Sequence, residues 1–344
     1  MEEETGRETA LRYGVPYKGS KNQIAEWVVA NLPRAEYFVD LFCGGCAVTH
    51  AALLSRKWER FIINDIDGRM PKFFLDAAHG KYTIENHPEW VSREEFHAKK
   101  GSDVYVALVW SFGNNGKDYI YGEDVEEHKR GLHYAVFYDD LSVLKRQGVN
   151  LTRSSEKTVY GRYADYKGQI RRMTELLSKG AEDGRCEQLE HLQQFEHLAR
   201  LQSLQSLQSL QSLQSLQSLQ SLQSLQSDYA SVNIPDGAVI YCDPPYSGTN
   251  CGKYEGFDSE RFHAWARQQD NIFISEYNMP DDFIIVDEIE KTVLSAANGN
   301  SQKAIERLYT NERTYNRMSD RQKRIITLNG AQQLSLFDMG VIDT

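Results

Sequence analysis

The chain has 344 residues, of which 40% are hydrophobic, and this is enough apolar material for one large core or two moderate ones. It has no run of about 18 apolar residues, and its first residues include Glu2, Glu3, Glu4 and Glu8, so we expect a soluble, cytoplasmic protein without a membrane span or signal peptide. The formal net charge of -10 excludes a uniformly basic DNA-coating protein, but a local basic patch could still bind DNA because salt screens charges beyond about 10 Å.

The five cysteines are an odd number and are scattered along the chain, which argues against a disulfide framework. Cys43 and Cys46 form a Cys-x-x-Cys pair, and Cys242 ends an expected strand. A metal or redox pair is the alternative, but no second pair of cysteines or histidines completes a tetrahedral set. We therefore expect no metal site.

The amino-terminal region begins with a basic, glycine-containing turn, Tyr17-Lys18-Gly19-Ser20-Lys21. Ser20 to Gln23 has the form of a capping box, and apolar residues follow at helical spacing from Ile24 to Leu32, as far as Pro33. The pattern predicts a first helix with one apolar face. The turn before it can face an anion or a carboxylate.

A strand at 37–42, the glycine turn Gly44-Gly45 and a small-residue helix at 47–54 come next. Such a turn lets a ligand approach the backbone closely. The following strand, 61–63, ends shortly before Asp65, which lies about 20 residues after the turn, the spacing at which a carboxylate binds ribose hydroxyls. The alternative is that Asp65 caps a helix.

The region 68–200 leaves this alternation of strands and helices and holds two candidates for nucleic-acid contact. Trp110 to Lys117 combines aromatic, amide and basic side chains, which suit unstacked bases and adenine edges. Basic residues outnumber acidic ones between 145 and 179, and we expect this segment to bind phosphates. The alternatives are an ordinary Asn-Gly turn and a solvated helix face. The candidate DNA-binding residues are Phe112, Asn114, Asn115, Lys117, Arg153, Arg162 and Lys167.

The segment 201–227 repeats Leu-Gln-Ser nine times. In an α-helix successive leucines are offset by about 60°, so they wind around the helix and form no single apolar stripe. In a strand they would alternate between the two faces. We expect a length-tolerant, partly helical spacer without a catalytic role.

Ala238 to Cys242 is a short run of β-forming residues that ends in Asp243-Pro244-Pro245-Tyr246. It predicts a buried strand with the tetrapeptide at its carboxyl end, where open α/β sheets place chemistry. The tetrapeptide suits methylation of an exocyclic amino group. Asp243 and the Pro244 carbonyl can accept the amino hydrogens, and Tyr246 can stack on an extruded base. The alternative is a Pro-Pro turn capped by Asp243.

A helix containing Phe262 and strands at 272–274 and 283–286 complete an α/β sheet. The tail, 329–344, contains a short peptide that resembles the bacterial sliding-clamp binding peptide, with two adjacent apolar anchors and a glutamine for the rim of a groove. The alternative is a tail that packs on its own domain. The candidate clamp-binding residues are Gln333, Leu334, Leu336 and Phe337.

Four motifs in order, Tyr17 to Lys21, Asp40 to Gly45, Asn64-Asp65 and Asp243 to Tyr246, resemble those of the Dam-type (class D12, alpha group) DNA adenine-N6 methyltransferases. The resemblance implies a Rossmann-like methyltransferase sheet formed by 1–67 and 228–328, with an inserted, mostly helical target-recognition region at 68–200. It implies catalysis by Asp243, Pro244, Pro245 and Tyr246. It also implies an S-adenosylmethionine site formed by Tyr17, Lys21, Asp40, Phe42, Gly44, Gly45, Asp65 and Asp243.

The sequence therefore predicts a site-specific DNA adenine-N6 methyltransferase that flips its target adenine out of double-stranded DNA. The sliding clamp is a further expected partner, and DNA restriction-modification is a setting that the resemblance implies. Two alternatives stay open. One is a methyltransferase of the same fold acting on RNA adenine or cytosine N4, and the other is a catalytically decayed DNA- or clamp-binding protein.

Overall fold

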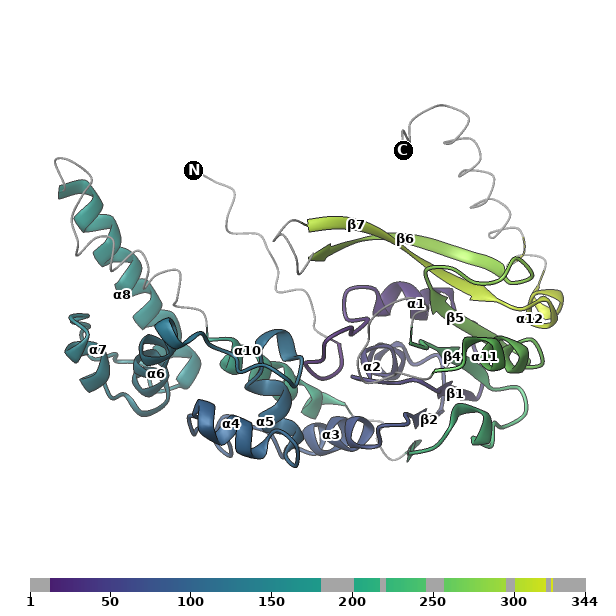
Figure 1. Cartoon of the computed structure of the whole chain (residues 1–344), viewed down its shortest axis with the longest axis horizontal. Helices are drawn as coiled ribbons and strands as arrows, with labels where there is room; N and C mark the ends of the chain where they lie inside the picture. Colours follow the sequence, from purple (N-terminus) through teal and green to yellow (C-terminus); the bar gives the residue numbers. More distant parts are fainter. Residues whose placement is uncertain are drawn as a thin grey trace. The chain divides into compact units, whose positions relative to one another are not determined.

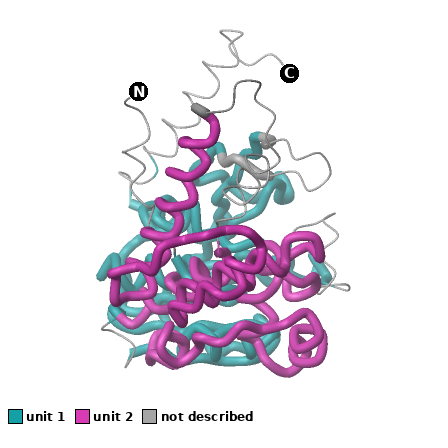
Figure 2. Tube along the Cα trace, turned by 90° about the vertical axis from the view of Figure 1, so that its left-hand side faces the viewer, with its two compact units in different colours: residues 1–15, 19–75, 215–344 teal, residues 16–18, 76–214 magenta. Residues whose placement is uncertain are grey.

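A computed structural model describes residues 13–180, 201–216, 221–245, 257–294, 301–319 and 323. The chain divides into two compact units, coloured separately in Figure 2. Unit 1 comprises residues 1–15, 19–75 and 215–344, and unit 2 comprises residues 16–18 and 76–214. We expected a boundary after residue 67, whereas the two units divide after residue 75, within helix α3 (Arg69–Ala78). The Leu-Gln-Ser repeat is divided between the two units after residue 214.

Unit 1 is built on one seven-stranded sheet with the order β3-β2-β1-β4-β5-β7-β6. Figure 1 labels each of these strands except β3. The first five strands are parallel, whereas β7 is antiparallel to both β5 and β6. This sheet confirms the predicted α/β class. The strands are β1 Tyr37–Asp40, β2 Arg60–Asn64, β3 Leu222–Leu225, β4 Val239–Cys242, β5 Ile272–Glu276, β6 Ile284–Leu294 and β7 Ser301–Thr310.

The strand order reverses between β1 and β4. From β1 the chain moves outward to β2 and later to β3, and it then returns to place β4 on the other side of β1. In open α/β sheets a crevice forms at the carboxyl ends of the strands where the order reverses, and ligands bind there. We therefore expect a ligand-binding site at the carboxyl ends of β1 and β4.

The central strands are apolar because both faces of the sheet are covered, as is usual for parallel strands. On one face Val39, Ile240 and Ile274 pack with Phe262 of α11 in a single core cluster. Parallel neighbours also need crossover connections, which helices supply. The remaining helices of unit 1 are α1 Ala25–Asn31, α2 Ala47–Ser55, the 3-10 turn η4 Tyr229–Ser231, α11 Ser259–Ala266 and α12 Glu312–Arg317.

Helix α1 begins later than the predicted capping box. Its N-cap is Ile24, which makes no side-chain capping bond, and the buried Ser20 hydroxyl has no hydrogen-bond partner among the described residues. Long-range contacts hold this segment instead, since Asn22 accepts the backbone N–H of Tyr13 at 2.6 Å and Lys21 forms ion pairs described below. The capping-box prediction was wrong because tertiary contacts outweighed the local pattern.

Unit 2 consists mainly of helices in its described residues. Trp110 and Tyr166 are among its largest fully buried side chains, and Trp90 stacks on Tyr121 with ring centroids 5.5 Å apart. An aromatic core of this kind buries much apolar area per residue. The helices are α4 Arg93–Lys99, α5 Val104–Val109, η1 Phe112–Asn114, α6 Glu123–Tyr138, α7 Ser142–Arg146, α8 Val159–Gly180 and α10 Gln202–Ser212.

The Leu-Gln-Ser repeat forms regular structure in both units, which differs from the expected spacer. It supplies α10, the 3-10 turn η2 (Leu213–Ser215) and the edge strand β3. The leucines do wind around α10, but the serines beside them are buried as well, so most of the helix circumference is packed. The buried residues of this segment are Leu201, Ser203, Leu204, Ser206, Leu207, Ser209, Leu210, Leu213 and Leu216.

Candidate active site

Asp243 lies directly after β4, at the carboxyl edge where the strand order reverses. Its carboxylate is 2.7 Å from the Lys21 ammonium, which is also 3.3 Å from the Glu306 carboxylate. Glu306 comes from β7 and is fully buried, whereas 20% of the Asp243 side chain is exposed. The ammonium of Lys21 therefore bridges two carboxylates, one fully buried and one partly exposed.

The ion pairs keep Lys21 charged. Burial by itself lowers the pKa of a lysine, but attraction to Asp243 and to Glu306 outweighs it here, so the pKa of Lys21 is raised above its ordinary value. Sequence reasoning placed Lys21 at the cofactor. The structure places its ammonium against the carboxylate of the Asp-Pro-Pro-Tyr motif.

A third carboxylate belongs to the same edge. Glu276 ends β5 and is buried, and one of its oxygens accepts the Tyr277 N–H at 2.8 Å. Burial, followed by the charges of Asp243 and Glu306, raises the pKa of Glu276 to about 7. Glu276 can therefore gain or lose a proton near neutral pH.

The glycine turn after β1 is tied to β2 through Asp65. Gly44 adopts a φ of 43°, and its N–H donates to Oδ2 of Asp65 at 2.9 Å. Oδ1 of Asp65 accepts the Asp67 N–H at 2.8 Å. Asp65 does not cap α3, which begins only at Arg69. Its carboxylate fixes the shape of the turn.

The segment before α1 covers the same turn. The Val15 N–H donates to the Gly45 carbonyl at 2.8 Å, and the Gly14 N–H donates to Nδ1 of His50 at 3.0 Å. Gly14 has a φ of 71°, and a Cβ atom there would lie 2.2 Å from the Gly45 oxygen. Gly14 is thus a glycine required by close backbone approach, and the sequence motifs did not single it out.

Asp40 and Phe42 flank the turn in different ways. Asp40 is buried, and its Oδ2 accepts the Thr49 hydroxyl at 2.6 Å. Burial, together with the charges of Asp243 and Asp65, raises the pKa of Asp40 to about 7. The ring of Phe42 packs against Tyr229 with centroids 5.3 Å apart, so Phe42 supports the turn from the aromatic core.

The three described cysteines are buried near this turn. Burial raises the pKa of Cys43, Cys46 and Cys242, which keeps them as thiols at neutral pH. Cys46 has a φ of 57° at the N-cap of α2. Within the described part of the chain, no group of three or more His, Cys, Asp or Glu side chains could hold a metal ion.

In unit 2 the loop around η1 exposes one aromatic ring. Phe112 is 66% exposed. In contrast, the amide of Asn114 donates to the Leu108 carbonyl at 2.8 Å, and Oδ1 of Asn115 accepts the Lys117 N–H at 2.7 Å. The two amides therefore shape the loop, while Phe112 and Lys117 face solvent.

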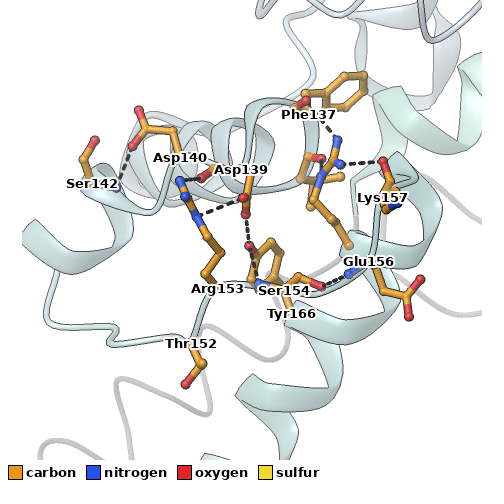
Figure 3. Close-up of polar contacts among 12 residues, drawn as sticks. Phe137, Asp139, Asp140, Ser142, Thr152, Arg153, Ser154, Glu156, Lys157 and Tyr166 are labelled. Atoms are coloured by element: carbon orange, nitrogen blue, oxygen red, sulfur yellow. Dashed lines mark hydrogen bonds and ion pairs between the residues drawn. The ribbon is translucent and has the colours of Figure 1, made fainter.

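Two of the predicted phosphate-binding arginines have partners in unit 2, although the Arg153 side chain is 74% exposed. The Arg162 guanidinium donates to the carbonyls of Val136 and Phe137 in the last turn of α6, at 2.7 and 3.1 Å. Arg153 pairs with Asp139 at 2.9 Å, and Figure 3 draws this ion pair. Both arginines thus interact with the carboxyl end of α6. Lys167 on α8 is exposed.

The remaining predicted site residues lie outside the described residues or in unit 2. Tyr246 and the tail peptide with Gln333, Leu334, Leu336 and Phe337 lie outside the described residues. Tyr17 belongs to unit 2 and is half-buried, whereas the rest of the predicted cofactor set belongs to unit 1.

Sequence reasoning missed Glu306, although a signal for it existed. The strand pattern places Glu306 on the same face as Leu308, and that face is buried, while the neighbouring Ile305 is 47% exposed. A glutamate in the inward-facing register of a strand needs a buried partner.

Comparison with known protein families gives one match. The profile of the D12 class N6 adenine-specific DNA methyltransferase family matches residues 17–191, just over half of the chain. The chain therefore belongs to this family of DNA adenine methyltransferases, which confirms the recognition based on its motifs. A search of curated proteins found no match. Among the described residues no helix has the length and apolar character needed to cross a membrane.

Proposed function

We propose that this protein transfers a methyl group from S-adenosylmethionine to N6 of adenine in double-stranded DNA, on a Rossmann-like sheet. The position of Asp243 is the main support for this proposal. Its carboxylate stands at the carboxyl end of β4, beside the reversal of strand order, and Lys21 holds it at 2.7 Å. The exposed part of this carboxylate can accept a hydrogen bond from a substrate.

The residues around the glycine turn suit a cationic cofactor. S-adenosylmethionine carries a positive sulfonium, an ammonium group and ribose hydroxyls, all of which pair well with carboxylates. Asp40, Asp65 and Asp243 are close enough that the charges of the other two raise the pKa of Asp40. We propose that Asp65, Gly44 and Gly45 hold the cofactor with help from Asp40 and Phe42. When bound, the cofactor supplies an electrophilic methyl group.

The chain's own groups activate the adenine. The amino lone pair is delocalised into the ring, so the nitrogen becomes a better nucleophile when acceptors bind both of its hydrogens. Asp243 and the Pro244 carbonyl supply these acceptors, and the fixed φ angles of Pro244 and Pro245 hold them in place. Tyr246 stacks on the flipped base.

We further propose that some of the DNA-binding candidates contact DNA and that the others hold them in position. The exposed Phe112 stacks on bases, and Lys117 and Lys167 bind phosphates. The amides and arginines that already bond within unit 2 keep these groups in position. They are Asn114, Asn115, Arg153 and Arg162.

A methylation assay tests the activity. Duplex DNA incubated with labelled S-adenosylmethionine should yield N6-methyladenine, and Asp243→Ala should lower the rate at least about 100-fold because an aimed acceptor is lost. Cofactor affinity, measured by calorimetry, should change little. In the same assay Lys167→Ala should raise KM for DNA and leave kcat unchanged.

Asp281→Ala is the matched control, since Asp281 is an exposed carboxylate in the turn before β6. Label in RNA adenine or in N4-methylcytosine would favour the corresponding alternative acceptor. DNA binding without any methyl transfer would favour a decayed enzyme. Full activity of Asp243→Ala would refute the role given to Asp243.

We also propose that residues 333–337 of the tail bind the bacterial sliding clamp. The support is the peptide itself, which places the adjacent apolar residues Leu336 and Phe337 three and four residues after Gln333. Extended peptides with such anchors bind grooves on folded partners. Binding to the clamp would raise the local concentration of DNA around the enzyme.

A further inference from the structure

The carboxylate proposed to receive the adenine is held from a distant part of the chain. Lys21 comes from the turn before α1, Asp243 follows β4, and Glu306 lies in β7, which is separated from β4 by β5. The Lys21 ammonium is 2.7 Å from Asp243 and 3.3 Å from Glu306. Three separate segments therefore meet at one ammonium group.

Burial makes the contact with Lys21 important for Glu306. A carboxylate taken out of water costs several kcal/mol unless it is paired, and Glu306 is fully buried. Its position is fixed by the sheet, because β7 pairs with β5 and places Arg307 opposite Glu276. Glu306 is thus a rigid anchor for Lys21, whereas Asp243 lies at the partly exposed end of β4.

We propose that Glu306 is a positioning residue, which acts through Lys21 to hold the Asp243 carboxylate in the orientation that accepts the adenine amino group. This inference rests on the proposed function. Glu306 does not touch the base. Glu306 and Asp243 bind the same ammonium, and Glu306 keeps that ammonium in one place. Asp243 therefore meets the substrate in a single orientation.

Removing the charge of Glu306 should therefore slow the chemical step and leave binding intact. In Glu306→Gln the ammonium loses the attraction of its fully buried carboxylate, so Asp243 is no longer tied through Lys21 to the rigid strand β7 and loses its fixed orientation. A misplacement of about 1 Å at a reacting group costs about 100-fold in rate. We expect a loss of about 10- to 100-fold in the single-turnover methylation rate.

The test measures rate and binding separately. Wild type, Glu306→Gln and Glu306→Asp are compared for single-turnover rate, cofactor affinity and KM for DNA, with circular dichroism to show that each variant is folded. Glu306→Asp keeps the charge on a shorter side chain and should recover part of the rate. Glu290→Gln is the matched control, because Glu290 pairs with Lys303 on the same two-stranded ribbon but is exposed.

The outcomes distinguish this inference from the proposed function. A reduced rate with unchanged cofactor affinity and KM, partly restored in Glu306→Asp, supports it. An active wild type with an equally active Glu306→Gln overturns the role of Glu306 alone. The role of Glu306 is also overturned if Glu306→Gln raises KM without lowering the rate, or if its rate and binding equal those of Glu290→Gln. A wild type that forms no methyladenine overturns both the proposed function and this inference.

Discussion

Asp40 shows how a single buried carboxylate makes stability depend on pH. Its pKa is raised from an ordinary value of 3.8 to about 7, first by burial and then by the charges of Asp243 and Asp65. The folded state therefore binds more protons than the unfolded state between pH 4 and 7. Because of this, the contribution of Asp40 to the free energy of unfolding falls as the pH rises through that window.

We expect Asp40→Asn to stabilise the protein at pH 8 by about 1 to 3 kcal/mol, because it removes a buried charge. The asparagine oxygen can still accept the Thr49 hydroxyl. At pH 5 the wild-type carboxyl is already neutral in the fold, so the gain should be much smaller. Urea unfolding at both pH values measures this difference, with the exposed Asp281→Asn as control. A gain of the same size at pH 5 and pH 8 would contradict the assignment.

For single residues, the sequence predicted where a side chain lies in a strand or turn better than it predicted which side chains pair. It placed Asp243 at the end of a strand and Asp65 near the glycine turn, because both follow short apolar runs. It did not predict that Lys21 would pair with Asp243 or that Glu306 would join them. Such pairs depend on which strands become neighbours, and no local pattern around Lys21 contains that information.

Among the elements, the repeat has an unusual relation between sequence and packing. A shift of three residues along α10 brings the same residue type back to every position, because each triplet is identical. The same holds for β3. Different triplets can therefore form α10 and β3, and each buried position would still hold the same type of side chain.

We expect an eight-triplet protein to fold with a stability within about 1 kcal/mol of the wild type, because α10 and β3 are refilled by identical residues. Deletion of Ser206 alone should cost at least about 2 to 5 kcal/mol, because it rotates part of α10 by one residue and removes buried leucines from their sites. Thermal and urea unfolding compare the two variants. Equal losses in both would rule out this degeneracy.

The sequence predicted the central strands well and the outer elements less well. β1, β2, β4 and β5 are apolar runs buried on both faces, and burial is the property that hydrophobic patterns report. The edge strand β3 is made of leucine, glutamine and serine, and it is a strand because β2 offers it backbone partners. Tertiary context decided its structure, as it did the start of α1.

The whole molecule combines a net negative charge with a polyanionic substrate, so attachment to DNA through a partner would be useful. We expect the double variant Leu336→Ala, Phe337→Ala to lose retention on immobilised sliding clamp, because each apolar anchor contributes about 1 to 3 kcal/mol to binding. Its methylation rate on short duplexes should equal that of the wild type. Ile342→Ala, in the same tail, is the control. Undiminished retention would disprove clamp binding through this peptide.

The strand order also governs how the protein is made. On the ribosome β1 and β2 emerge early, but the other neighbour of β1 is β4, which follows only after residues 76–214 of unit 2 have been synthesised. The other neighbour of β2 is β3, which also follows these residues. Until then both edges of the nascent β1–β2 pair lack a partner strand, and such edges promote aggregation. We therefore expect the yield of folded protein to depend on translation speed and chaperone supply, whatever the stability of the finished sheet.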